Sequence, residues 1–200
     1  MKLMQRFRFA TMVSLVFFAY TSIAQMLSGE ALITALQGGG YVIVMRHASS
    51  PRQAPDVETA NPDNVNLERQ LDESGRRDAI AMGDSLRRLM IPIAEVESSP
   101  TYRTLETADL AGFSEVEVQE ELGNRDMRSS GEAYAAWLRK RVADTPRQGN
   151  ILLITHSPNI GGAFPELNPG PEEGEALIFD PNRSHTTPVA RVSIIEWADF

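Results

Sequence analysis

Two short apolar runs that each end in a histidine constrain this chain most. Residues 41–45 (Tyr-Val-Ile-Val-Met) run directly into Arg46 and His47, and residues 151–155 (Ile-Leu-Leu-Ile-Thr) run into His156. Continuous runs of aliphatic and β-branched residues are typical of strands buried on both faces of a parallel sheet. Ligands of such α/β folds bind beyond the carboxyl ends of the strands. We therefore predict an α/β fold with a mostly parallel central sheet and a site at this edge.

An Arg-His pair after a single strand has two readings. It can belong to a binding site, but an isolated pair is more often a solvated strand end with a hydrogen-bonded histidine. The second histidine strand favours the binding site, because two parallel strands bring both histidines to the same sheet edge.

A third stretch adds an arginine to the same region. Residues 94–98 read as a strand, and Ser99 followed by Pro100 is typical of a helix N-cap and first helical position. Arg103 is then expected in the first turn of the helix, beside backbone N–H groups without partners inside the helix. The sequence therefore predicts two imidazoles and two guanidinium groups around one site.

The ordered set of motifs resembles the histidine phosphatase superfamily, which includes phosphoglycerate mutases and acid phosphatases. The chain departs from the usual pattern at Ala48 and at Ser157, where the family commonly has glycine. Several motifs in order are more specific than any one alone. They are Arg-His-Ala at 46–48, Leu-Asp-Glu-Ser-Gly-Arg at 71–76, Ser-Pro-x-x-Arg-x-x-Glu-Thr-Ala at 99–108 and Thr-His at 155–156, and the resemblance spans about residue 41 to the C-terminus.

The resemblance implies a three-layer α/β/α sandwich and a phosphomonoester hydrolase. It implies that His47 takes the phosphoryl group as a phosphohistidine, while Arg46, Arg103 and His156 bind the phosphoryl oxygens. This assignment is chemically reasonable, because a neutral imidazole is a competent nucleophile and planar guanidinium groups bind phosphate oxygens in pairs. The N-terminus of the helix after Ser99 is expected to add partial positive charge.

The proton donor is not assigned by the resemblance. In the best-known branch of the family a glutamate lies two residues after a leucine in this region, and the matching residue after Leu122 is Asn124. Asp126 and Glu121 are candidates in its place, although loop carboxylates are more often solvated or capping.

The loop at residues 49–66 is polar and long for a compact domain, which favours a lid or specificity loop. Arg52 is the cation of this loop. Two readings of Arg52 stay open: a contact with the substrate phosphate, or an exposed and solvated side chain.

Neither a metal nor a cofactor is expected. The chain has no cysteine and no H-x-x-H or H-x-E cluster, which disfavours a metallohydrolase. Its third histidine, His185, is expected in a turn with a structural or solvated role. There is no P-loop or Rossmann glycine fingerprint, and Gly38 to Gly40 precede a strand as a turn.

The N-terminal residues 1–24 are predicted to be a secretory signal peptide, and residues 25–200 a single histidine phosphatase-like domain. Three cations precede an apolar run that is short for a membrane span, although an uncleaved anchor is the alternative. Cleavage would change the net charge from −8 to −11, since it removes three positive charges and no negative one. We expect a periplasmic or secreted protein that neither binds nucleic acid nor keeps a stable membrane span.

Three functions compete at this point. The first is a hydrolase that acts on a small phosphorylated metabolite, a phosphorylated envelope sugar or a phosphoprotein. The second is a non-catalytic phosphate-binding or scaffold domain, which the departure at Asn124 allows. The third is a phosphomutase, which the predicted export disfavours because a mutase needs a cytoplasmic pool of sugar phosphates.

Overall fold

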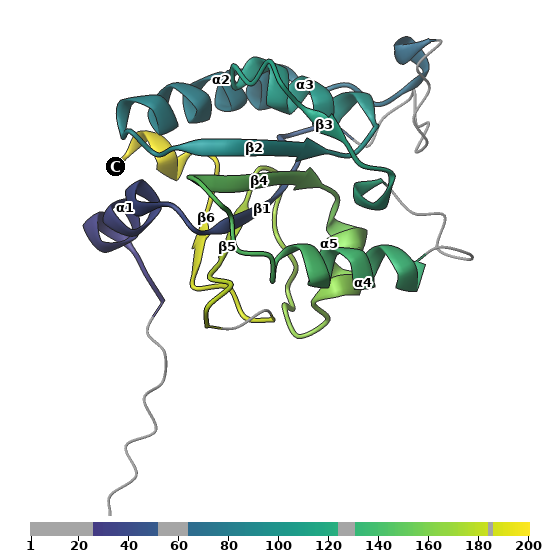
Figure 1. Cartoon of the computed structure of the whole chain (residues 1–200). Coiled ribbons are helices and arrows are strands. Elements are labelled where there is room, and N and C mark those ends of the chain that lie inside the picture. The colour runs from purple at the N-terminus through teal and green to yellow at the C-terminus, as the bar shows by residue number, and fades with distance from the viewer. Residues whose placement is uncertain (1–25, 52–63, 124–130, 184–185) are drawn as a thin grey trace, which may run out of the picture.

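The computed structural model describes residues 26–51, 64–123, 131–183 and 186–200 (Figure 1). The predicted signal peptide therefore lies outside the described residues, as do Arg52, Asn124, Asp126 and His185. No helix in the described ranges is both long enough and apolar enough to cross a membrane. The helices are α1 (Gly29–Gly38), α2 (Glu73–Arg88), α3 (Tyr102–Leu110), α4 (Gly131–Arg141) and α5 (Ser157–Ala163), with short 3₁₀ turns at Val65–Leu67, Glu120–Leu122 and Glu196–Ala198.

The described strands form one mixed sheet that is mostly parallel, as predicted. Its order is β3-β2-β4-β1-β5-β6. The first four of these strands run parallel, and β5 and β6 complete the sheet in antiparallel pairings. The strands are β1 (Val42–Arg46), β2 (Ile93–Ser98), β3 (Glu117–Val118), β4 (Asn150–Thr155), β5 (Ala176–Phe179) and β6 (Ala190–Val192).

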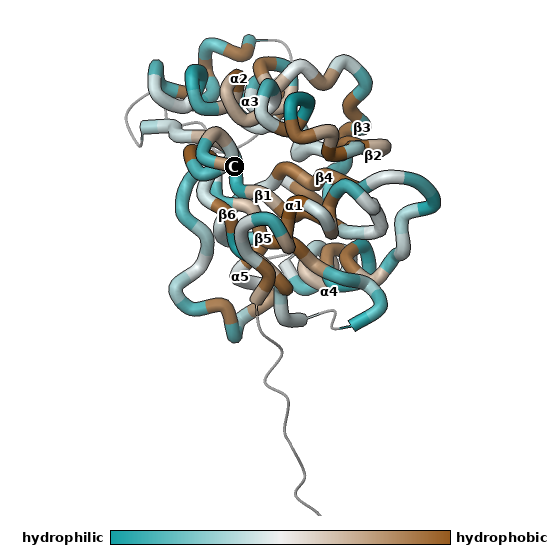
Figure 2. The backbone as a smooth tube through the Cα atoms, turned by 90° about the vertical axis from the view of Figure 1, so that its left-hand side faces the viewer, coloured by the Kyte–Doolittle hydropathy of each residue, from teal (hydrophilic) through white to brown (hydrophobic). Residues whose placement is uncertain are grey.

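Helices cover both faces of the sheet, which confirms the predicted three-layer arrangement (Figure 1). One core cluster packs α1, α2 and α3 against alternate strand residues such as Ile43 and Met45. The other packs α4 and α5 against the intervening residues, including Val42 and Val44. Successive strand residues point to opposite faces, so β1 is apolar from Val42 to Met45 because both faces are covered. Figure 2 shows the hydrophobic colour on the central strands and hydrophilic colour on many outer turns.

The pairing of β1 with β4 positions the predicted histidines. The two strands are parallel, and Arg46 lies opposite Thr155. His47 and His156 are the next residue on each strand, and the His47 backbone N–H donates to the Thr155 carbonyl at 3.1 Å. The parallel register therefore brings residues more than a hundred positions apart to one edge of the sheet.

Two predicted boundaries are wrong. The helix after β2 begins at Tyr102 with Thr101 as its N-cap, so neither Ser99 nor Pro100 has the predicted helical role. The Ser99 backbone N–H instead donates to the Ile154 carbonyl, which extends the contact between β2 and β4 by one residue. The sequence of residues 189–197 by itself predicts a closing strand, but β6 ends at Val192, and the chain turns into the 3₁₀ helix that holds the buried Trp197.

Gly83 sets how closely α2 approaches the end of α3. A Cβ atom built on Gly83 would lie 2.1 Å from the Ala111 carbonyl oxygen. That separation is far below a van der Waals contact, and the opposing atom belongs to the backbone and cannot rotate away. The helix that carries Arg103 is therefore held against α2 at a distance that only glycine permits.

We expect Gly83→Ala to destabilise the fold by about 2 kcal/mol or more, because overpacking outweighs the gain in helix propensity of about 1 kcal/mol. Gly161→Ala is the matched control, since Gly161 is also helical and has nothing within 4 Å of the added Cβ. Urea unfolding of the two variants measures the difference. An unchanged or increased free energy of unfolding for Gly83→Ala would contradict the close approach.

Candidate functional site

His47 is a buried histidine at the carboxyl end of β1, with 3% of its surface exposed. Its Nδ1 lies 2.8 Å from the carbonyl oxygen of Ala48. A carbonyl oxygen only accepts hydrogen bonds, so Nδ1 carries the proton and Nε2 carries the lone pair. The Ala48 backbone N–H donates to the Thr107 hydroxyl on α3 at 3.2 Å, which fixes the turn that presents the ring.

The surroundings of His47 keep its ring neutral. The pKa is lowered from 6.5 to about 3, mainly by burial and also by the nearby charges of Arg103, Arg46 and Arg69, while the hydrogen bond to Ala48 opposes these effects. A neutral imidazole with its lone pair on Nε2 is the form that can act as a nucleophile.

His156 lies beside His47, with the ring centroids 5.4 Å apart and the ring planes at 61°. The Arg103 Nη2 is 3.2 Å from His156 Nδ1, and an arginine only donates, so Nδ1 accepts. Nε2 then carries the proton and donates to the Ser99 hydroxyl at 2.9 Å. Burial, followed by the charge of Arg103, holds the pKa of His156 well below its usual value. These contacts orient Arg103, and the predicted donation from His156 to phosphate stays a prediction.

The helix α3 explains the spacing of the second motif. Arg103, Glu106 and Thr107 are separated by three and four residues, so they share one face of the helix. Arg103 is 1% exposed and contacts His156. Glu106 accepts from the Leu71 backbone N–H at 3.2 Å and from Arg76 at 2.8 Å. Together with the Thr107 bond to the first motif, these contacts tie three distant parts of the chain to one site.

The N-terminus of α3 is partly occupied by a side chain that sequence reasoning missed. The Glu68 carboxylate accepts from the Tyr102 backbone N–H at 2.7 Å, and the Ser99 hydroxyl accepts from the Thr101 backbone N–H at 3.3 Å. A carboxylate at this end of a helix is favourable because it faces the positive end of the helix dipole. Two N–H groups at this helix terminus therefore have protein partners, and its contribution to phosphate binding stays a prediction.

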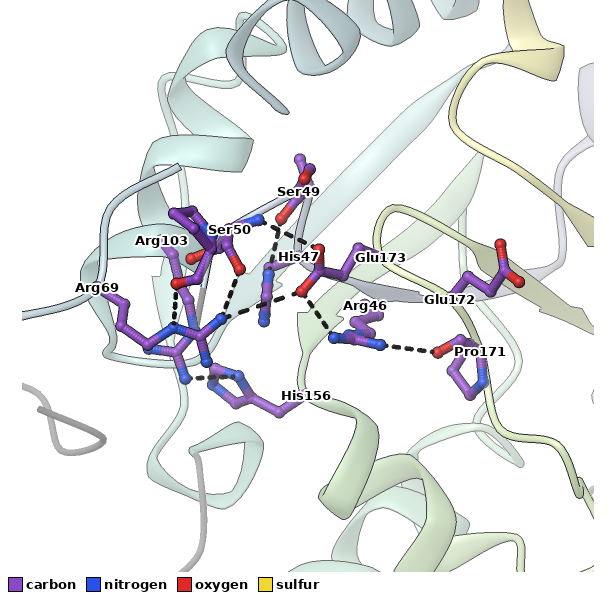
Figure 3. A network of polar contacts seen from close by, with 12 residues as sticks. Arg46, His47, Ser49, Ser50, Arg69, Arg103, His156, Pro171, Glu172 and Glu173 are labelled. Carbon is purple, nitrogen blue, oxygen red and sulfur yellow. Dashed lines mark hydrogen bonds and ion pairs between the residues drawn. The ribbon is translucent and has the colours of Figure 1, made fainter. Parts of the chain in front are cut away.

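Arg46 lies at the end of β1 and contacts the segment before β5. One Nη atom donates to the Glu173 carboxylate at 2.8 Å and the other to the Pro171 carbonyl at 3.2 Å (Figure 3). Arg46 also contributes to the lowered pKa of both histidines. The predicted group of Arg46, His47, Arg103 and His156 is thus brought together by the fold.

Arg69 is a third cation that the sequence did not identify. It is buried, and it donates to the carbonyls of Ser50 at 2.6 Å and Pro51 at 3.2 Å. Its charge lowers the pKa of both histidines. A signal was present, because Arg69 lies two residues before the Leu-Asp-Glu-Ser-Gly-Arg motif at residues 71–76. The polar loop is predicted to end at Asn66, so the sequence motifs give Arg69 no role.

The candidate proton donors fall in different parts of the chain. Asp126 lies outside the described residues. Glu121 lies in the 3₁₀ turn after β3, where its carbonyl accepts from the Asn159 side chain at 2.8 Å. The Thr155 hydroxyl donates to the neighbouring Leu122 carbonyl at 2.7 Å. These bonds anchor the turn to the end of β4, beside the histidines.

The arrangement is suited to an anion rather than to a metal ion. Three guanidinium groups lie close enough to the histidines to lower both pKa values. Among the residues that the structure describes, no group of three or more His, Asp or Glu side chains is arranged to hold a metal ion. Buried cations beside a neutral nucleophile are the requirements for attack on a negatively charged phosphoryl group.

The chain resembles known proteins in both sequence and structure. A family model described as the histidine phosphatase superfamily (branch 1) matches residues 42–150, which is more than half of the chain. This segment includes His47 and Arg103 and stops before His156. No curated protein matches the chain closely enough to count as a relative.

Solved structures share the fold at low sequence identity. The protein histidine phosphatase SixA complexed with tungstate is 22% identical at a TM-score of 0.50, over 78% of this chain and 98% of that one. A putative phosphohistidine phosphatase SixA from Agrobacterium tumefaciens is 16% identical at a TM-score of 0.53, and the match covers 77% of this chain and 97% of that one. A phosphoserine phosphatase from Entamoeba histolytica, in complex with 3-phosphoglyceric acid, is 15% identical at a TM-score of 0.53, and the match covers 76% of this chain and 96% of that one.

We expect the His47 ring to stay neutral from pH 7 down to about pH 4, because its pKa is lowered from 6.5 to about 3. Ring ¹⁵N chemical shifts in a pH titration measure this directly, with the Nδ1-protonated form expected throughout. Because the folded pKa lies below the unfolded one, His47 contributes to stability above about pH 6.5 and that contribution is lost as the pH falls toward 3. A ring that titrates near pH 6.5 in the folded protein would contradict the buried, cation-flanked site.

Proposed function

Since the chain belongs to the histidine phosphatase superfamily, we propose that it hydrolyses phosphomonoesters through a phosphohistidine formed on His47. The single observation that carries the proposal is the His47 ring itself. Its Nδ1 proton is fixed by the Ala48 carbonyl, and its neutral Nε2 faces a region of guanidinium charge. The structural neighbours support the shared fold, and the contacts within this chain support the chemistry.

The proposed reaction has two transfers. In the first, His47 Nε2 attacks phosphorus, an Nε2–P bond forms and the bond from phosphorus to the leaving oxygen breaks. The leaving oxygen takes a proton from an acid of the protein. In the second, water attacks the phosphohistidine, the Nε2–P bond breaks, and inorganic phosphate leaves the neutral imidazole behind.

The cations have a defined part in this scheme. Guanidinium groups that are already buried and oriented stabilise the transferring phosphoryl group without rearranging during the reaction. Arg103 is oriented by its bond to His156, and Arg46 by its bonds to Glu173 and Pro171. Because residues 1–24 are predicted to be a signal peptide, the proposed substrates are phosphomonoesters outside the cytoplasm. Recovery of the protein in the cytoplasmic fraction alone would contradict the proposed location.

We expect purified protein to hydrolyse p-nitrophenyl phosphate and His47→Asn to lose this activity by at least about a thousandfold, because the nucleophile is removed. Arg103→Lys should lower kcat/KM about a hundredfold, since a lysine does not reproduce the planar fork. Arg77→Lys is the matched control, because Arg77 lies on the exposed side of α2 with 67% of its side chain accessible.

The same assay separates the alternatives. Turnover that survives unchanged in His47→Asn would remove His47 from its role. Wild-type protein that binds phosphate or tungstate but releases no product would favour the non-catalytic binding domain.

A further inference from the structure

Glu173 is a carboxylate in the site that neither the sequence motifs nor the resemblance pointed to. It lies on the segment between α5 and β5, and its side chain is 26% exposed. Oε1 accepts from Arg46 at 2.8 Å and lies 4.0 Å from the Arg69 guanidinium. Oε2 accepts from the Ser50 backbone N–H at 3.3 Å. Figure 3 shows this carboxylate between the two arginines, beside His47.

The groups around Glu173 form an anion-binding site. A guanidinium at hydrogen-bond distance, a second guanidinium nearby and a backbone N–H are the donors that phosphoryl oxygens use in proteins. In the described structure the Glu173 carboxylate occupies this site. A phosphoryl group that reaches His47 and binds Arg46 therefore competes with Glu173 for the same guanidinium.

The same carboxylate borders the space open to a leaving group. A cavity of about 530 Å³ is lined by Arg46, Ser49, Ser50, Pro51, Glu172 and Glu173. A phosphoryl group bound to Arg46 would therefore lie next to Glu173, at the edge of this cavity. A leaving oxygen between the two comes within reach of the Glu173 carboxyl group.

We propose that Glu173 is the proton donor to the leaving oxygen, and this inference rests on the phosphohydrolase function proposed above. The arriving phosphoryl dianion displaces the carboxylate from Arg46. A carboxylate that has lost its hydrogen bond to Arg46 and lies beside two negative charges is placed to take a proton from solvent.

The Glu173 carboxyl group then takes part in two proton transfers. As His47 Nε2 bonds to phosphorus and the P–O bond breaks, the Glu173 carboxyl gives its proton to the leaving oxygen, which departs as an alcohol. The resulting carboxylate accepts a proton from the water that later attacks phosphorus. Inorganic phosphate leaves, and Glu173 releases this proton to solvent as its carboxylate returns to Arg46.

Leaving-group dependence tests this role. An alkoxide needs a proton to leave, whereas 2,4-dinitrophenolate leaves without one. We expect Glu173→Gln to lower kcat/KM for an alkyl phosphate such as glycerol 2-phosphate about a hundredfold or more, and to change kcat/KM for 2,4-dinitrophenyl phosphate by less than about threefold. The use of kcat/KM confines the measurement to steps up to the first phosphoryl transfer.

Two further variants serve as controls. Glu173→Asp keeps the carboxyl group and should recover part of the activity on the alkyl phosphate. Glu166→Gln removes the same charge from an exposed glutamate on the same segment between α5 and β5, outside the lining of this cavity, and should leave kcat/KM for both substrates unaffected. Thermal unfolding of each variant verifies that it is folded.

The other outcomes overturn the proposal. An equal loss on both substrates would mean that Glu173 only orients Arg46, and an equal gain would mean that it only competes with the phosphoryl group. In both cases the phosphohydrolase function stands if the wild type hydrolyses the dinitrophenyl ester and His47→Asn does not. If the wild type does not hydrolyse the dinitrophenyl ester, both the phosphohydrolase function and the role of Glu173 are contradicted.

Discussion

The parallel pairing of β1 with β4 is the constraint on which the rest of the site depends. It sets Arg46 opposite Thr155 and thereby brings His47 and His156 to adjacent positions. Both strands are buried on both faces, because helices pack against each side of the sheet. A shift of one residue in either strand would turn each histidine to the other face and separate the rings, since side chains alternate along a strand. The apolar packing of the two faces therefore also fixes the geometry of the polar edge.

The site at this edge of the sheet combines neutral histidines with charged arginines. The two imidazoles are neutral because they are buried and flanked by guanidinium groups. The arginines stay charged and are oriented by carbonyls, by Glu173 and by the lone pair of His156. An unpaired charge is costly to bury, so each cation has a polar partner that an arriving dianion can supplement or replace. The same contacts that stabilise the resting site thus prepare it for a phosphoryl group.

The sequence predicted the elements whose signals are local and strong. The apolar runs of β1 and β4 and the histidines at the strand ends have short-range patterns, and Arg103 was predicted from the Ser-Pro pair that precedes it. The start of α3 was misplaced because Ser99 matches an N-cap but is held by the Ile154 carbonyl and by His156. Tertiary contacts decided between two local readings there. Arg69 and Glu173 carry no motif, and their roles come from the way the sheet and its loops bring them to Arg46.

The central claim is that the His47 Nε2 atom takes the phosphoryl group. The most direct measurement is rapid quenching of the protein during turnover of a ³²P-labelled monoester, followed by peptide mapping. The account predicts label that is stable in base, labile in acid and confined to the peptide that contains residues 42–47. Label on another residue, or steady turnover with no labelled protein at any quench time, would contradict it.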